Sequence, residues 1–193
     1  MKYITSFKLV HRSFPVLLTG LSLLISGCAT FQELTCAQFE EKRKDTDFNT
    51  QYHLANEGPE IIGRYSIIPL RGKSAAVRVY KMHVDPTAIK PCNYLTIHKA
   101  VYIQRDNSTG QILEEVREFY TDKGTLMTTK TESVGDQFQV SGYYAAELPL
   151  PIPQKAPPGK YRIVSKLIMK NKIKSKGIVL ARANATFQVV SRK

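Results

Sequence analysis

The chain lacks a hydrophobic run long enough to cross a membrane as a helix. The apolar stretch 14–25 has 12 residues, whereas a membrane-spanning helix needs about 20. A composition of 42% hydrophobic and 23% charged residues excludes disordered, collagen-like and polytopic membrane chains. Because domains have roughly 100–200 residues, the 193 residues predict one domain plus a targeting segment.

The sequence also lacks the short motifs that mark many active sites. It has no His-Glu-x-x-His, Gly-x-Ser-x-Gly or Cys-x-x-Cys motif, no P-loop and no Gly-x-Gly-x-x-Gly. His83, Asp85 and His98 are candidates for metal or acid–base chemistry, because the first two share a strand face and the third follows on the next predicted strand. Since no third ligand stands at a standard spacing, we predict no enzyme activity, no metal and no cofactor.

Acidic residues are missing from both ends of the chain. None precedes Glu33, so Lys2, Lys8 and Arg12 form a basic segment ahead of the apolar stretch. None occurs in residues 148–193, which contain 11 Lys and Arg residues. This last segment therefore accounts for the positive charge of a processed chain, and it predicts anionic surroundings without distinguishing lipid, polysaccharide and nucleic acid.

Residues 1–27 have the organisation of an export signal, with the basic segment followed by the apolar stretch. The next residues, Ile25-Ser26-Gly27-Cys28, resemble the lipobox of bacterial lipoproteins. In that family the cysteine sulfur receives a diacylglycerol, cleavage precedes the cysteine, and the new amino group is usually acylated. The resemblance implies that Cys28 is lipidated and becomes the first mature residue. Cleavage that leaves a soluble secreted protein is the alternative.

The lipobox resemblance also implies a location. Two or three acyl chains anchor a protein stably, since each buried CH₂ contributes about 0.8 kcal/mol. Ala29, rather than Asp, follows the cysteine, which favours the outer membrane under enterobacterial sorting. We therefore expect a protein of the bacterial envelope at the periplasmic face of the outer membrane. The membrane is then a partner through the anchor, and nucleic acid is not.

Lipidation of Cys28 would leave one pair of cysteines, Cys36 and Cys92, in an oxidising compartment. A bridge would close a loop of about 56 residues, worth ~4 kcal/mol by chain entropy. Two free or buried thiols are the alternative. We interpret residues 28–59 as the lipidated N-terminus and a tether, with a short helix where Phe31, Leu34 and Phe39 approach helical spacing.

Residues 60–193 alternate β-like runs with turn signals, which predicts an all-β domain. The predicted strands are 61–68, 75–84, 94–105, 112–120, 125–131, 137–148, 161–169 and 178–190. The run 112–120 would also suit a helix, and we interpret its carboxylates Glu114, Glu115 and Glu118 as a solvated face. No long helical period is present for a crossover between parallel strands, so a parallel α/β fold is disfavoured.

The end of the chain is the most diagnostic part. The prolines of 148–153 exclude a central strand there, because proline lacks the donor that a ladder needs. The sequence Pro-Pro-Gly-Lys-Tyr at 157–161 and the alternating last strand resemble the closing hairpin of immunoglobulin-like β-sandwiches in envelope proteins. The resemblance implies an antiparallel sandwich of seven to nine strands, in which the Tyr161 hydroxyl bonds back to upstream backbone. An up-and-down barrel and a jelly roll are alternatives.

The segment between the last two predicted strands has a lysine at every second position: Lys170, Lys172, Lys174 and Lys176. In an extended chain they share one side, which suits a solvated, edge-protecting tip or an anion-binding site. The predicted function is a membrane-anchored, non-catalytic module that binds or scaffolds an unknown envelope protein. A carrier or receptor for an anionic glycolipid or polysaccharide is the alternative, and it would need an apolar or grooved pocket.

Overall fold

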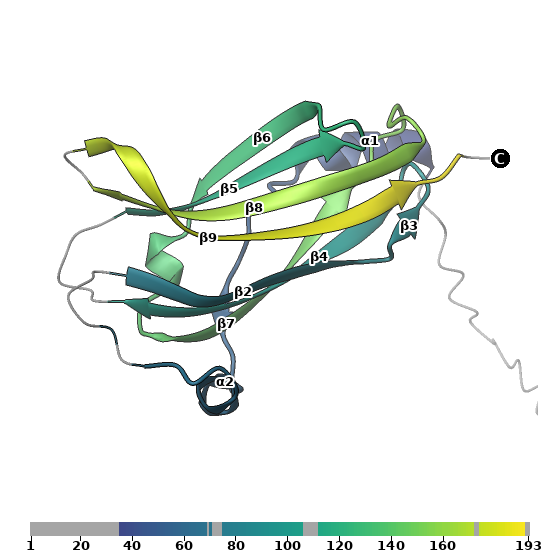
Figure 1. Cartoon of the computed structure of the whole chain (residues 1–193). Coiled ribbons are helices and arrows are strands. Elements are labelled where there is room, and N and C mark those ends of the chain that lie inside the picture. The colour runs from purple at the N-terminus through teal and green to yellow at the C-terminus, as the bar shows by residue number, and fades with distance from the viewer. Residues whose placement is uncertain (1–34, 69, 71–74, 106–111, 172–173, 192–193) are drawn as a thin grey trace, which may run out of the picture. The chain divides into compact units, whose positions relative to one another are not determined.

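The computed structural model describes residues 35–68, 70, 75–105, 112–171 and 174–191. These ranges contain two α-helices, one 3₁₀ turn and nine strands. The strands form two facing sheets (Figure 1). The helices are α1 (Cys36–Asp45) and α2 (Gly58–Arg64), and the 3₁₀ turn is η2 (Gly135–Gln137). The strands are β1 (His53–Leu54), β2 (Ala75–Asp85), β3 (Ala88–Ile89), β4 (Tyr94–Arg105), β5 (Ile112–Thr121), β6 (Leu126–Ser133), β7 (Gly142–Pro151), β8 (Gly159–Asn171) and β9 (Lys174–Val189).

The two sheets have the strand orders β1-β7-β4-β2 and β3-β9-β8-β5-β6. All pairs are antiparallel except the two-residue pair of β3 with β9. The predicted all-β sandwich of seven to nine strands is therefore confirmed, with nine strands in the described residues. The run 112–120, which also suited a helix, lies within strand β5.

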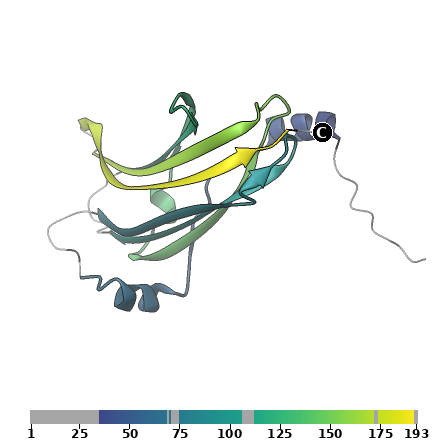
Figure 2. The same ribbon diagram turned by 45° about the vertical axis from the view of Figure 1, so that its right-hand side comes forward.

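The predicted strand 61–68 is wrong, because its first half belongs to helix α2. Pro59 stands in the first turn of α2, where the backbone N–H that proline lacks would have no helical partner. Ile61 is buried against Val79 and Tyr102, so α2 covers part of the outer face of the first sheet (Figure 2). Ile61 thus serves a helix–sheet contact, whereas its neighbour Ile62 remains 41% exposed.

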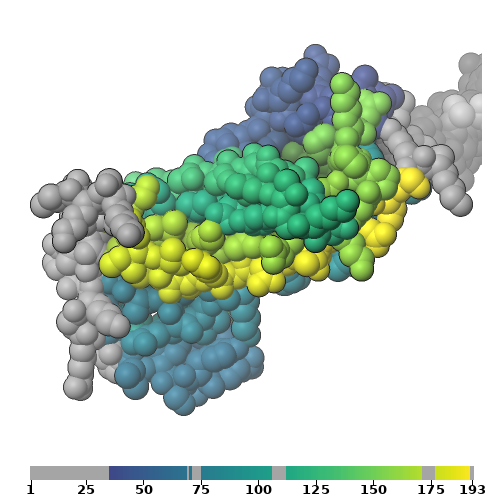
Figure 3. Space-filling view, turned by 45° about the horizontal axis from the view of Figure 1, so that its top comes forward, coloured from purple at the N-terminus to yellow at the C-terminus, as the bar shows by residue number. Residues whose placement is uncertain are grey.

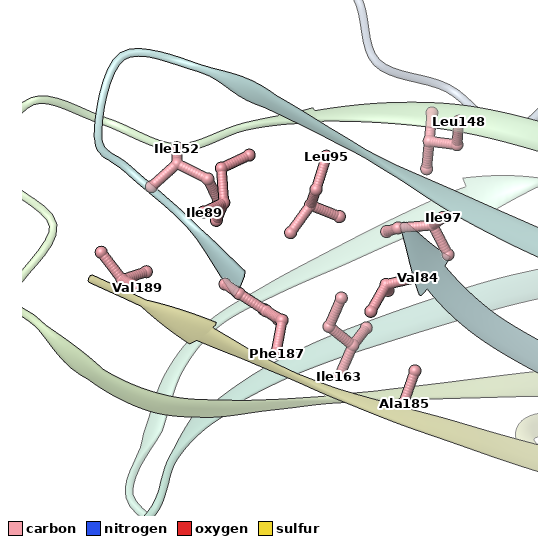
Figure 4. Packing of buried hydrophobic residues seen from close by; sticks show 10 residues of the cluster. All are labelled: Val84, Ile89, Leu95, Ile97, Leu148, Ile152, Ile163, Ala185, Phe187 and Val189. Atoms are coloured by element: carbon pink, nitrogen blue, oxygen red, sulfur yellow. The ribbon is translucent and has the colours of Figure 1, made fainter. Parts of the chain in front are cut away.

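Residues that alternate inward from both sheets fill the interior of the sandwich. In β9 the inward positions Ala183, Ala185, Phe187 and Val189 are all buried, as the sequence predicted. Figure 4 shows ten such side chains meeting from the two layers. A second cluster, around Val101, Phe138 and Leu167, continues the core toward the other end of the sandwich.

Helix α1 is capped at its start and is held against the sandwich by an aromatic contact and a disulfide. Thr35 caps its first turn in a reciprocal capping box with Gln38. Phe39 is 1% exposed and lies against Tyr94, with ring centroids 4.8 Å apart. The predicted Cys36–Cys92 disulfide is confirmed, with Cα atoms 5.3 Å apart, and it ties the helix to the segment that precedes β4. Neither helix in the described residues is long and apolar enough to cross a membrane.

Strand β7 continues through Pro149 and Pro151, the residues that excluded a central strand. It pairs there with β4 alone, since β1 reaches only Ala145 and Tyr144. The prolines therefore lie at an edge of the sheet, where a missing N–H donor is tolerated. This open edge of β7 is also where the pocket described next is found.

Candidate functional site

A pocket of about 360 Å³ lies between the two sheets at the end that α1 covers. Strands β5, β6, β7, β8 and β9 all contribute to its wall, together with the segments that follow α1 and β7. The lining is mostly apolar: Phe48, Phe119, Met127, Leu150, Pro151, Ile152, Pro153, Ala156, Tyr161, Phe187 and Val189. Met127 remains 51% exposed, so an apolar side chain also faces solvent beside the pocket.

The polar side chains of the lining are one threonine and three cations: Thr128, Arg43, Arg117 and Lys130. Among the described lining residues, every charged one is therefore positive. Arg43 comes from α1, Arg117 from β5 and Lys130 from β6. Figure 3 shows α1 and the residues after it lying against the β5–β6 side of the sandwich, the arrangement that brings Arg43 to strands far away in sequence.

Each cation of the lining has a carboxylate partner that does not itself line the pocket. Arg43 pairs with Glu40 at 2.6 Å, Arg117 with Glu132 at 2.5 Å, and Lys130 with Asp47 at 3.1 Å. The side chain of Arg117 is only 2% exposed. The carboxylates hold the cations in place, while the positive ends of the pairs face the apolar space.

Two buried donors of the lining are left without an acceptor. The Nε–H groups of Arg43 and Arg117 meet no hydrogen-bond partner within the described part of the chain. Both hydrogen bonds that Arg117 makes there, to Glu132 and to the Phe48 carbonyl at 2.9 Å, come from Nη2. A buried N–H without an acceptor costs about 1–3 kcal/mol, so the pocket wall has donor capacity that the fold does not use.

A fully buried ion pair lies deeper between the sheets. Lys99 on β4 and Glu115 on β5 form it, and neither side chain is exposed to solvent. Because β4 and β5 belong to different sheets, the pair joins the two layers. Glu115 also accepts hydrogen bonds from Ser165 and from the hydroxyl of Tyr52 at 3.1 Å, so its charge is satisfied on several sides.

The buried pair is connected to the pocket through Thr50. Lys99 donates from Nζ to the Thr50 hydroxyl at 2.8 Å. The Thr50 hydroxyl and amide in turn donate to Glu132 at 2.9 and 2.8 Å, and Glu132 holds Arg117. We call the residues Thr50, Lys99, Glu115, Arg117, Glu132 and Ser165 the buried network. Arg117 is its one member in the pocket wall, and the network fixes its position.

The environment of the buried pair shifts both pKa values. Burial lowers the pKa of Lys99 to about 8, against the attraction of Glu115. Burial raises the pKa of Glu115, but Lys99, Ser165 and Arg117 together outweigh that effect and hold it below its ordinary value of 4.5. Both groups are therefore ionised at neutral pH, although neither side chain is exposed to solvent.

The histidine candidates are brought together on the outer surface of the first sheet. His83 and His98 face each other across β2 and β4, with rings stacked at 4.6 Å. His98 Nδ1 lies 3.3 Å from Glu147. Asp85 is opposite Thr96 in the register. In the described residues, no group of three or more His, Cys, Asp or Glu side chains could hold a metal ion.

The lysine candidates are only partly described. Lys170 pairs with Glu114 of β5 at 2.5 Å, so an acidic residue from another strand offsets its charge. Lys174 and Lys176 lie at the start of β9, where only the backbone is described, and Lys172 and Cys28 lie outside the described residues. Tyr161 lines the pocket and donates its hydroxyl to the Pro157 carbonyl at 2.6 Å.

The interpretation of Glu115 as part of a solvated face is wrong, and the network around it was missed. Glu115 and Arg117 share the inner face of β5 with Leu113, which is 1% exposed. Because side chains alternate between the two faces of a strand, the inward position of Leu113 predicts that Glu115 and Arg117 also point inward. Glu114 and Glu118 do lie on the other face, where they pair with Lys170 and Lys166.

No family model and no curated protein sequence matches this chain. Among solved structures, a family 123 glycoside hydrolase from Clostridium perfringens, studied for glycolipid glycan hydrolysis, aligns at a TM-score of 0.41 with 11% identity. The alignment covers 76% of this chain but only 28% of the hydrolase. The CARDB domain of the PF1109 protein from Pyrococcus furiosus aligns at a TM-score of 0.34 with 15% identity, over 67% of this chain and 97% of that domain. Likeness at this level says nothing about function.

Proposed function

We propose that the protein is a lipid-anchored, non-catalytic binding module of the bacterial cell envelope, with the pocket as its binding site. The observation that supports binding is an apolar space of about 360 Å³ whose charged lining residues are all cations. Small-molecule sites typically have roughly 300–1,000 Å³ of mostly apolar surface with a few placed polar groups. The enclosure of Lys99 and Glu115, neither of which is exposed to solvent, supports a non-catalytic role.

The pocket can be tested with the anionic apolar dye 1-anilinonaphthalene-8-sulfonate. Ala156 lines the pocket, so Ala156→Phe should fill it and abolish saturable dye binding. Lys155→Phe adds the same ring at an exposed neighbouring position outside the lining and should leave the site intact. Equal saturable binding by both variants, with matching thermal unfolding, would remove the pocket as the binding site.

The anchor is a separate part of the proposal and has its own test. Mass spectrometry of the mature chain should find a diacylglycerol on Cys28 and cleavage before it. Membrane fractionation should then recover the protein with the outer membrane, facing the periplasm. A mature N-terminus beyond Cys28, without lipid, would contradict the anchor and leave a secreted binding module.

A carrier or receptor for an anionic glycolipid or polysaccharide is the second candidate function. The pocket favours it over pure scaffolding of a protein, because a scaffold needs no apolar space between its sheets. Solvent extraction of protein purified from envelopes, followed by mass spectrometry, separates the two. A stoichiometric anionic lipid supports the carrier, whereas a lipid-free protein that crosslinks to one envelope protein supports the scaffold.

A further inference from the structure

We infer that the pocket takes one acyl chain of a free, single-chain amphiphile with an anionic head, a fatty acid or a monoacyl phosphate. The inference rests on the proposed function and names the ligand class of the same site. The apolar part of the ligand follows from the lining, in which eleven of the fifteen residues are apolar or aromatic. The volume of about 360 Å³ is near the lower limit for ligand sites, which favours one acyl chain over a lipid with two or more chains.

The charge of the head follows from the cations of the lining. Arg43, Arg117 and Lys130 face the pocket, while their partners Glu40, Glu132 and Asp47 lie outside the lining. A guanidinium has five donors in a planar fork that matches carboxylate and phosphate oxygens. The buried network holds Arg117, so this donor needs no reorganisation when a ligand arrives.

The unused donors point to an acceptor on the ligand. Arg117 is nine-tenths buried or more, and its Nε–H has no acceptor in the described chain. The Nε–H of Arg43 on α1 is also buried without an acceptor in the described chain, although the side chain as a whole is 30% exposed. A neutral hydrocarbon would leave both guanidinium groups as they are, whereas a head with two oxygens would give them acceptors.

The proposed anchor makes such amphiphiles available. Cys28 precedes the helix cap Thr35 by seven residues, and an extended chain spans at most about 3.6 Å per residue. The domain would therefore remain within about 25 Å of the attachment point, at a surface where acyl chains are abundant. The chain's own acyl groups are a competing source of the same chemistry, and the experiment must separate them from free ligand.

The experiment titrates the full chain with Cys28→Ser, which carries no lipid, by displacement of the naphthalene dye. Fatty acids of 8, 10, 12 and 14 carbons should bind about 4-fold tighter per added CH₂ until the pocket is full. The alcohol of equal length should bind about 10-fold more weakly or worse, because a hydrogen bond to a charged group is lost. Acetate and inorganic phosphate should not displace the dye.

A matched pair of variants tests the head. Arg43→Gln should weaken fatty-acid binding about 10-fold and leave the alcohol unchanged, and Arg43→Lys should restore part of the difference. Lys44→Gln removes one charge from the same helix at an exposed position outside the lining, and it should change neither. Equal affinity of acid and alcohol for the parent would overturn the anionic head.

The remaining outcomes separate the ligand from the function. If the dye binds in the pocket and no acyl compound displaces it, the acyl inference fails and the binding module stands. If the dye does not bind in the pocket, both fail. If the Cys28→Ser chain binds fatty acids and the lipidated parent does not, the pocket is occupied by the chain's own anchor. That result would exclude a free amphiphile as the ligand.

Discussion

At the level of Lys99 and Glu115 the interior of the sandwich is filled by ion pairs, whereas toward α1 the same two sheets leave a pocket. In the first region each charge meets an opposite charge and further hydrogen bonds. In the second region the wall is apolar, and guanidinium donors remain without acceptors in the described chain. Arg117 belongs to both regions. The network therefore satisfies its own charges, whereas the pocket wall keeps the donor capacity that the proposed ligand would use.

The largest effect should come from leaving one member of the buried pair without the other. Glu115→Leu would strand the Lys99 ammonium inside the sandwich, and we expect a loss of about 3–5 kcal/mol in the free energy of unfolding. The double change Lys99→Met and Glu115→Leu removes both charges and should recover most of that loss. Urea unfolding of the parent, both single variants and the double variant measures the coupling. A loss in the double variant equal to the sum of the two single losses would show that the charges do not depend on each other.

Breaking the disulfide should have the next largest effect on the free energy of unfolding, and it should also weaken binding in the pocket. Cys36→Ser with Cys92→Ser opens a loop with a sequence separation of 56, which typically costs about 2–4 kcal/mol. Because α1 carries Arg43, the variant should also bind the anionic dye more weakly. Unfolding and dye titration in parallel measure the two effects. Unchanged dye binding would mean that Phe39 and the other contacts of α1 hold the helix without the bridge.

The parts of the fold that the sequence predicted are those with a local signal. The alternation in β9 and the strand boundaries around β4 follow from period two within a single segment. The failure at α2 has the same origin: Ile61 and Ile62 suggest a strand, although Pro59 in the first turn and the polar neighbours suit a short helix. The bridge was predicted from a pair of cysteines in a chain expected to be exported, with two free or buried thiols as the alternative.

The pocket and the network could not be predicted because they depend on contacts between distant segments. Lys99 and Glu115 are partners across two sheets, and Thr50 joins them from a segment about 50 positions earlier than Lys99. A charged residue in a strand is usually outward-facing; period two along β5 can place Glu115 on the inner face, but it does not show which distant residue neutralises its charge. The pocket forms where the edge of β7, the end of β5 and helix α1 lie close together. The pattern of no single segment predicts that arrangement.

Acid should destabilise the fold by protonating carboxylates that are ion-paired in the folded chain. Hydrogen bonds from Arg43 lower the pKa of Glu40, hydrogen bonds from Lys166 lower that of Glu118, and Lys99 and its neighbours lower that of Glu115 despite burial. In acid the unfolded chain then binds more protons than the folded one. These carboxylates therefore contribute fully to the free energy of unfolding above about pH 4.5, and their contribution falls as the pH drops below it.

The acid dependence can be assigned to the network by one comparison. Unfolding free energy as a function of pH should lose most of its acid slope in the Lys99→Met and Glu115→Leu double variant. Glu118→Gln, which changes a half-buried carboxylate on the outer face of β5, should flatten it only slightly. A slope that is unchanged in the double variant would attribute acid unfolding to other carboxylates.

The smallest effect concerns the pocket wall itself. Tyr161 donates to the Pro157 carbonyl at 2.6 Å and stacks on Phe187 with ring centroids 5.4 Å apart. Tyr161→Phe keeps the ring and removes the hydroxyl, so we expect a loss of about 1 kcal/mol in unfolding free energy. Tyr65→Phe is the control, since its hydroxyl meets Lys81 at the surface and exposed changes usually stay within about 0.5 kcal/mol. Because the apolar lining is preserved, affinity for the dye should stay constant in both variants. A Tyr161→Phe protein that unfolds like the parent but binds the dye differently would mean that the hydroxyl acts on the ligand and not on the turn.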